Sequence, residues 1–267
     1  MRLAAIKNNQ KNSPDLKVKK QSSFALYWKY RYLTLMFIPA VIYFIIFKYI
    51  PIYGIQIAFK SYRFKDGIFG SPWIGLENFK YLFSVPSFWE VLRNTLIIST
   101  YNLVLGFPAP IILALLLNEV RHAKFKKVVQ TISYLPHFIS WVVLGGIFVQ
   151  FLSPSSGPIN VVLKALGRNP IFFLADPRWF RTVLVVTSIW KGVGWNSIIY
   201  LATLSSIDPE QYEAADIDGA NRLQKMLHIT LPGLSHVVTI MLIFAVGGLI
   251  QDNFDQIYNL LLSPTVY

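Results

Sequence analysis

The sequence contains no cysteine, and only 14% of its 267 residues are charged. The lack of cysteine excludes disulfides, thiolate metal sites and a cysteine nucleophile. Acidic residues are the scarcer charged type, with 13 Asp and Glu against 25 Lys and Arg, which gives a net charge of +12. Asp, Glu, Lys and Arg are absent from residues 94–118, 128–163 and 226–251. Such long charge-free segments argue against an ordinary soluble domain.

Apolar residues make up 54% of the chain and fill these charge-free segments. An apolar helix of about 20 residues crosses a lipid bilayer. The short alternating segments of a β-barrel are absent. We therefore predict an all-α polytopic membrane protein with about five membrane helices, at residues 32–50, 94–117, 133–152, 181–207 and 235–250.

Prolines and glycines predict irregularities in this helical pattern. Pro108 and Pro110 are expected to kink or break the second membrane helix, which a membrane tolerates where protein or a cavity surrounds the break. Residues 191–194 (KGVG) are expected to interrupt the fourth helix. A short interfacial helix is predicted at residues 159–166, within the second of two outer loops.

The distribution of basic residues predicts the orientation in the membrane. Residues 1–31 form a basic tail with eight Lys or Arg and one acidic residue, and residues 118–127 carry four more. The proposed inner segments hold 14 Lys or Arg and the longer outer ones hold 9. Because cytoplasmic loops are enriched in Lys and Arg, we place the N-terminus in the cytoplasm and the transmembrane domain at residues 32–267. A specific lipid or nucleic-acid site in the tail is the weaker alternative, and no nucleic-acid partner is expected.

Residues 208–232 are an acidic stretch between two apolar runs, with five acidic and two basic residues. Asp208 suits an N-cap, Pro209 the first helical position and Gln211 the third position of a capping box. A helix is thus predicted at residues 209–217, and Gly219 suits a left-handed residue that ends it.

A second helix is predicted at residues 220–229, followed by a turn at residues 231–232 into the last membrane helix. Surface-lying amphipathic helices usually carry Lys and Arg on their polar face. An acidic loop on the cytoplasmic side therefore favours a protein partner with a basic groove over a connector resting on lipid.

Four stretches carry a family resemblance. Residues 213–232 resemble the EAA loop of ABC importer permeases in the spacing of Glu213, Ala214, Ala215, Gly219, Ile229, Leu231 and Pro232. Residues 73–79 (WIGLENF), followed by Asn94 and Thr95, are similar to the first outer loop of carbohydrate-type permeases related to the maltose transporter. Residues 47–54 and 190–195 resemble the branch that imports pectin- and alginate-derived oligosaccharides. The resemblance covers residues 27–267.

This resemblance implies the type I ABC importer permease fold, a bacterial inner-membrane location and a set of partners. In that family the loop is a coupling helix that docks into a cleft of a cytoplasmic ATPase. The resemblance implies a second homologous permease, two ATPase copies that bind the ATP and Mg, and an extracytoplasmic solute-binding protein. Family members continue further, so a sixth helix is expected beyond Tyr267. The implied ATPase-coupling residues are Tyr212, Glu213, Ala214, Ala215, Asp218, Gly219 and Ala220.

The residues predict no catalytic site, cofactor or metal in this chain. There is no G-x-x-x-x-G-K-[ST] phosphate-binding motif, and the four histidines lack metal-ligand spacing. Two other functions stay open. An ion-coupled secondary sugar transporter would use Lys191 with Asp252 and Asp255, and a membrane enzyme acting on lipid-linked saccharide would use the same two aspartates.

A path for an oligosaccharide needs aromatic faces for stacking and amides or carboxylates for hydroxyl groups. Polar groups at membrane depth usually face a cavity or the bundle interior. Membrane-interface anchoring explains any single Trp or Tyr about equally well. Lys191 is expected to be a pathway charge or half of an ion pair. The candidate path residues are Trp190, Lys191, Trp195, Asn196, Tyr200, Asn253 and Asp255.

Overall fold

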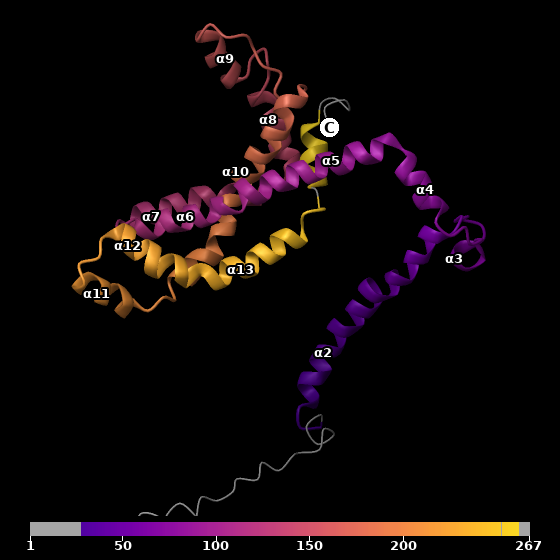
Figure 1. The fold of residues 1–267 in the computed structure, drawn as a ribbon, viewed down its shortest axis with the longest axis horizontal. Coiled ribbons are helices and arrows are strands. Elements are labelled where there is room, and N and C mark those ends of the chain that lie inside the picture. Colours follow the sequence, from indigo (N-terminus) through magenta and orange to yellow (C-terminus); the bar gives the residue numbers. More distant parts are fainter. Residues whose placement is uncertain (1–27, 252, 262–267) are drawn as a thin grey trace, which may run out of the picture. The chain divides into compact units, whose positions relative to one another are not determined.

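The computed structural model describes residues 28–251 and 253–261 (Figure 1). Most of the predicted basic tail, Asp252 and anything beyond residue 261 lie outside the described residues. The chain divides into two compact units, Met1–Ser84 and Val85–Tyr267. Their elements are helices and connecting loops, as predicted for an all-α protein.

The first unit begins with one long apolar helix. It consists of α2 (Arg31–Phe44), the π-helix η1 (Ile45–Tyr49) and the 3₁₀-helix η2 (Ile50–Phe59). Together they form a 29-residue span that is long and apolar enough to cross a membrane. The predicted end at residue 50 was wrong, because Pro51 occupies the first turn of η2, where no backbone donor is needed.

The rest of the first unit is a tightly bonded connector with two short helices, α3 (Gly67–Gly70) and α4 (Glu77–Ser84). Lys60 pairs with Trp73 in an antiparallel bridge, and its ammonium lies 4.7 Å from the Trp73 ring centre. Lys60 Nζ also donates to the Ile68 carbonyl at 2.7 Å. The Asn78 amide donates to the carbonyls of Ala58 and Lys60, each at 3.0 Å. Trp73 and Asn78 of the WIGLENF stretch therefore hold the connector against residues 58–60.

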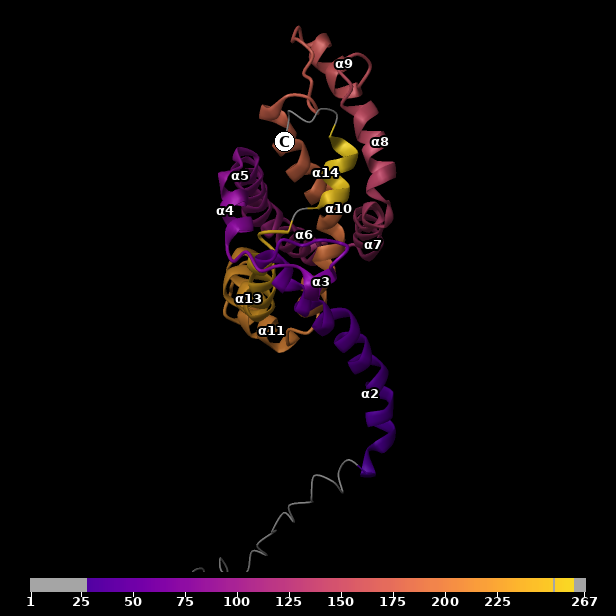
Figure 2. The same cartoon turned by 90° about the vertical axis from the view of Figure 1, so that its right-hand side faces the viewer.

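The second unit is a bundle around α10 (Figures 1 and 2). Helix α10 contacts α5, α6, α7 and α13, and nine of its residues are buried. The elements are α5 (Pro86–Tyr101), η3 (Asn102–Gly106), α6 (Pro108–Glu119), α7 (Ala123–Tyr134), η4 (Leu135–Phe138), α8 (Trp141–Phe151), α9 (Pro158–Ala165), α10 (Pro177–Leu204), α11 (Pro209–Ile217), α12 (Arg222–Lys225), η5 (Met226–Thr230), α13 (Leu231–Gly247) and α14 (Phe254–Leu260).

The second predicted membrane helix is continuous through its prolines. Elements α5, η3 and α6 form one helix of 34 residues, Pro86–Glu119. The π-helix η3 ends just before Pro108, and Pro108 and Pro110 then lie in the first turn of α6, where the missing amide donor costs little. The expected break is therefore absent, and the irregularity is the π-turn.

The third predicted membrane helix is broken. The helices Ala123–Phe138 and Trp141–Phe151 meet at an angle of 104°. Pro136 lies in the 3₁₀-helix η4, and the Ser140 hydroxyl caps the new helix by accepting the Val143 amide at 3.4 Å. A serine cap directly after a proline turn ends one helix and starts another.

The fourth predicted membrane helix, α10, is in contrast uninterrupted over 28 residues, so the expected break at residues 191–194 was wrong. Gly194 is a packing position. A Cβ atom at Gly194 would lie 2.1 Å from the carbonyl oxygen of Ser133 in α7, which shows how closely the two helices cross. The short helix predicted at residues 159–166 is present as α9, one residue earlier than predicted, and its interfacial position stays a prediction.

Within the described residues, three helices are long and apolar enough to span a membrane, or four if the bent α7–α8 pair counts as one span. The fourth predicted span, α10, is long enough but is not among them. Because α10 is enclosed by other helices, its residues face protein and can be more polar than those of a lipid-facing helix.

Candidate coupling loop and translocation cavity

The first helix of the acidic stretch has the predicted bounds. Helix α11 runs from Pro209 to Ile217, and the Asp208 carboxylate caps it by accepting the Glu210 amide at 3.0 Å. No side-chain bond from Gln211 back to Asp208 completes a capping box. That motif occurs instead at Asn221 and Gln224, whose side chains accept each other's backbone amides at 2.8 and 2.9 Å.

Gly219 ends α11 as the sequence predicts. Its φ is +74°, the left-handed conformation that glycine adopts without strain. The Gly219 amide donates to Asp216 at 3.1 Å and the Ala220 amide to Ala215 at 2.9 Å, a Schellman arrangement. The chain therefore turns over the four residues 218–221 and starts α12 beside α11.

The predicted turn at residues 231–232 is absent. Elements α12, η5 and α13 form one helix of 26 residues, Arg222–Gly247. The π-helix η5 ends at Thr230, and Pro232 follows in the first turn of α13, where its missing amide is tolerated. The last described membrane helix therefore reaches directly to the acidic loop.

Two side-chain contacts join α11 to the long helix that follows it. The hydroxyls of Tyr212 and Thr230 share a hydrogen bond of 3.1 Å, and Thr230 is 2% exposed. The ammonium of Lys225 lies 2.5 Å from the Asp216 carboxylate. These contacts hold α11 and the start of the long helix together as one hairpin.

The outer surface of α11 is accessible and acidic. Of the seven predicted coupling residues, Glu213, Ala214, Asp218 and Gly219 are exposed, and Tyr212, Ala215 and Ala220 are partly buried. Ile217 is 88% exposed beside them. Within the second unit α11 and α9 lie at opposite ends in both views (Figures 1 and 2). The loop thus presents carboxylates and an apolar side chain at one end of the bundle.

A cavity of ≈ 830 Å³ lies in the second unit. Its walls come from α5, η3, α6, α10 and α13 and from Gly248, Leu249, Gln251, Asn253, Gln256 and Ile257. This volume falls within the range of small-molecule binding sites. Its described polar lining consists of neutral hydrogen-bonding groups from Ser99, Asn102, Ser188, Trp195, Asn196, Tyr200, Gln251, Asn253 and Gln256.

Four of the seven predicted path residues line this cavity: Trp195, Asn196, Tyr200 and Asn253. The list of candidate path residues leaves out five other polar lining residues, Ser99, Asn102, Ser188, Gln251 and Gln256. Asn102 had a detectable signal, since an amide inside a charge-free apolar run implies a cavity or a buried partner. Asp252 lies outside the described residues.

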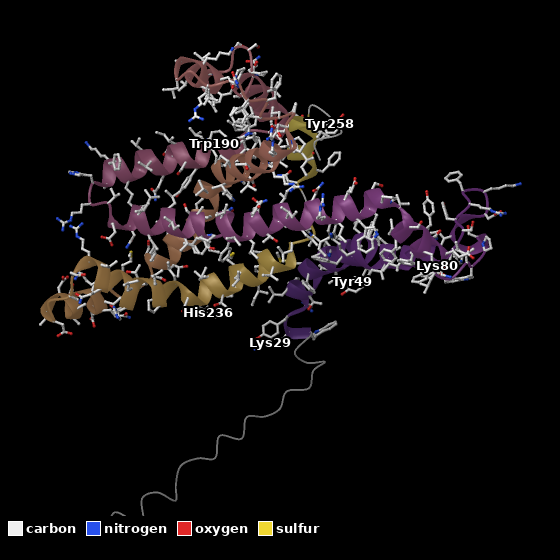
Figure 3. The ribbon with its side chains drawn as sticks, turned by 45° about the horizontal axis from the view of Figure 1, so that its top comes forward. Lys29, Tyr49, Lys80, Trp190, His236 and Tyr258 are labelled. Atoms are coloured by element: carbon white, nitrogen blue, oxygen red, sulfur yellow. The ribbon has the colours of Figure 1, made fainter. Side chains whose placement is uncertain are left out.

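The other three predicted path residues lie elsewhere in the described structure. Trp190, labelled in Figure 3, packs edge to face against Phe148 of α8 at 5.6 Å. Lys191 points to backbone carbonyls at the α7–α8 bend. Asp255 is exposed on α14.

A buried glutamine, Gln256, holds one wall of the cavity in place. The Gln256 side-chain amide donates to the Leu184 carbonyl at 2.7 Å and to the Thr187 hydroxyl at 2.9 Å. Gln256 is 4% exposed, so these bonds fix α14 to α10 away from water. Met241 and Ala245 of α13 also line the cavity. One continuous helix therefore reaches from the acidic loop to the cavity wall.

Several apolar helices around a polar-lined cavity define a polytopic membrane transport component. Residues 106–254 match the family described as binding-protein-dependent transport system inner membrane component, which is more than half of the chain. The chain belongs to this family.

The similar proteins include two permeases of Bacillus subtilis (strain 168). The chain is 47% identical over 231 residues to the polygalacturonan/rhamnogalacturonan transport system permease protein YteP, covering 86% of this chain and 72% of that protein. It is 45% identical over 228 residues to the protein LplB, covering 85% and 72%.

Two solved structures are also similar. The first is a bacterial ABC transporter involved in the import of the acidic polysaccharide alginate, with a TM-score of 0.83 and 41% identity, covering 91% of this chain and 82% of that one. The second is a bacterial alginate ABC transporter in complex with an alginate pentasaccharide-bound periplasmic protein, with a TM-score of 0.82 and 40% identity, covering 92% and 81%.

Proposed function

We propose that this chain is the permease subunit of a bacterial binding-protein-dependent ABC importer for an oligosaccharide. It would pair with a second homologous permease and two copies of a cytoplasmic ATPase, and receive its substrate from an extracytoplasmic solute-binding protein. The observation that carries this proposal is the single helix Arg222–Gly247, which links the exposed acidic hairpin to the wall of a polar cavity.

The chemistry of the cavity favours a hydroxyl-rich substrate. Asn102, Asn196 and Asn253 each offer an amide donor and acceptor, which suits sugar hydroxyl groups. Trp195 offers an aromatic face of the kind that saccharide rings stack on. Similar proteins are named for transport of polygalacturonan, rhamnogalacturonan and alginate, which supports an oligosaccharide as the substrate class.

The acidic hairpin supplies the coupling in this proposal. The exposed Glu213 and Asp218 would meet a basic groove of the ATPase, and the alanines between them let its surface approach closely. A displacement of α11 would pass to α13 through the Tyr212–Thr230 and Asp216–Lys225 contacts. Since α13 lines the cavity, ATP-driven closure of the ATPases would bias the cavity between its inward- and outward-open states.

Reconstitution with and without the partner proteins tests this function. Proteoliposomes containing both permeases and the ATPase are expected to accumulate oligosaccharide only with ATP and the solute-binding protein. The control is the same lipid with this chain alone under a sodium or proton gradient, which is expected to give no uptake. Gradient-driven uptake by the chain alone would contradict the proposal and favour an ion-coupled secondary transporter.

The proposed orientation has its own test, because the chain has no cysteine. Single cysteines at Ile217, which is 88% exposed on α11, and at Leu166, which is 72% exposed after α9, report on opposite ends of the second unit. We expect a membrane-impermeant thiol reagent outside intact spheroplasts to label Leu166→Cys and to label Ile217→Cys only after lysis. The reverse pattern would overturn the cytoplasmic placement of the hairpin.

A further inference from the structure

The bend between α7 and α8 is held by a side chain from another helix. Lys191 of α10 donates to the carbonyl oxygens of Pro136 at 3.2 Å, His137 at 2.9 Å and Ile139 at 2.5 Å. The last carbonyls of a helix lack intrahelical amide partners, and here two helices meet at 104°. Lys191 therefore supplies a donor to each of these three carbonyls, and the Pro136 carbonyl also accepts the Ile139 amide at 3.2 Å.

The geometry fits an ammonium group better than other donors. An ammonium has three N–H donors and no acceptor, and the three carbonyl oxygens account for all of them. The Lys191 Nζ also lies 5.5 Å from the ring centre of Trp141, the first residue of α8. Both sides of the bend thus contact the same side chain.

One of the capped residues carries an aromatic ring that packs against the cavity wall. The His137 ring lies parallel to the Trp195 indole, with ring centres 4.4 Å apart and planes 2° apart. Phe138 contacts the same indole edge to face at 5.5 Å. Trp195 lines the cavity and is 41% exposed, and His137 covers one face of its indole.

We propose that Lys191 is a positioning residue: by capping the α7–α8 bend it holds the His137–Trp195 stack, and hence the aromatic wall of the cavity. It acts through the backbone of η4 and does not touch the transported molecule. This role differs from a pathway charge, which needs a cation facing the cavity. This proposal for Lys191 rests on the proposed transport function, because it is tested by measuring uptake.

A double-mutant cycle in the reconstituted complex tests this role. Lys191→Met keeps the chain length and removes every donor, and Trp195→Leu removes the stack. We expect each single variant to lower the uptake rate about tenfold, because the part-buried carbonyls of His137 and Ile139 lose their Lys191 donor and the bend can then move. In the Trp195→Leu background, Lys191→Met is expected to lower uptake by less than about twofold, since residues acting through one contact are not additive.

A conservative variant separates positioning from charge. Arginine keeps the positive charge but spreads its N–H groups over a planar fork that does not converge on three carbonyls. Lys191→Arg is therefore expected to remain impaired, whereas a pathway charge would tolerate it. The matched control is Lys164→Met, because the exposed Lys164 donates to one carbonyl, that of Ser155, at 3.2 Å. Uptake by this control is expected to stay normal.

Three results would overturn the proposal: additive losses in the cycle, normal uptake by Lys191→Met, or full uptake by Lys191→Arg. If Lys191→Met does not insert, the Lys191→Arg comparison still decides between positioning and charge. Normal uptake by Trp195→Leu, in contrast, would remove Trp195 from the proposed substrate path. Co-purification of the ATPase with each variant shows that the complex is assembled, so loss of uptake is not loss of the partner.

Discussion

The hydroxyl of Tyr212 on α11 lies 3.1 Å from the hydroxyl of Thr230, and this bond joins the two arms of the acidic hairpin. The contact is far from the cavity, yet Thr230 belongs to the same continuous helix as the cavity-lining Met241. In the proposed mechanism, a movement of α11 reaches the cavity through this helix. In that mechanism the bond between the two hydroxyls would be part of the coupling.

Tyr212→Phe removes this hydrogen bond and leaves the ring in place. Loss of one such bond costs about 1 kcal/mol, so we expect the complex to assemble but to move less substrate per ATP hydrolysed. Thr230→Val removes the bond from the other side, and the double variant is expected to be no worse than either single one. If all three variants move as much substrate per ATP hydrolysed as the unchanged chain, the hydrogen bond makes no contribution to coupling.

Gly219 permits a test of backbone conformation alone. Its φ is +74°, but a Cβ at this position meets no atom within 4 Å. A β-branched residue there costs about 1–2 kcal/mol of conformational energy, whereas asparagine tolerates the left-handed region. We expect Gly219→Val to insert in the membrane but to uncouple ATP hydrolysis from uptake, and Gly219→Asn to retain more uptake. Equal uptake by both variants would show that the left-handed backbone conformation of residue 219 does not cause the loss of uptake.

Two glycines on neighbouring helices make a matched pair for stability. Gly194→Ala places a methyl group 2.1 Å from the Ser133 carbonyl oxygen, so α7 and α10 must separate. Overpacking of this kind typically costs about 1–3 kcal/mol. Gly146→Ala on α8 meets open space and is expected to be neutral or slightly stabilising. Thermal unfolding of the detergent-purified variants measures both, and equal midpoints would contradict the close helix crossing.

Trp190 and Trp195 are a matched pair for the substrate path. Both are on α10 and are similarly exposed, at 46% and 41%, but only Trp195 is among the described cavity-lining residues. We expect Trp195→Leu to lower uptake about tenfold and Trp190→Leu to lower it by less than about threefold, because removal of one stacking contact is worth about 1–1.5 kcal/mol. If Trp190→Leu has the larger effect, the path runs on the other side of α10.

Local sequence signals predicted the parts of the fold that depend on local chemistry. Asp208, Pro209 and Gly219 gave the bounds of α11, because caps and left-handed turns are set by a few neighbouring residues. The same is true of α9, which begins at a proline. The EAA-like spacing then supported the family to which the chain belongs.

The sequence did not predict features that depend on tertiary contacts. Gly194 was interpreted as part of a helix break. Its actual role is close packing against the Ser133 backbone, which is distant in sequence and so could not be recognised from the local pattern. The bend at Pro136 also depends on a remote residue, Lys191. Pro108 and Pro232 were tolerated because π-helices precede them, which periodicity alone does not reveal. The cavity-lining residues come from several helices, so only those with an obvious polar or aromatic signal were predicted.

Whether α11 couples this chain to an ATPase is tested most directly by Glu213→Lys. ATP hydrolysis and uptake are measured on the same proteoliposomes, with Glu119→Lys as the control, an exposed charge reversal at the end of α6. We expect Glu213→Lys to insert normally but to lose uptake coupled to ATP hydrolysis, while Glu119→Lys transports normally. Normal uptake per ATP by Glu213→Lys would contradict the assignment of α11 as the coupling helix.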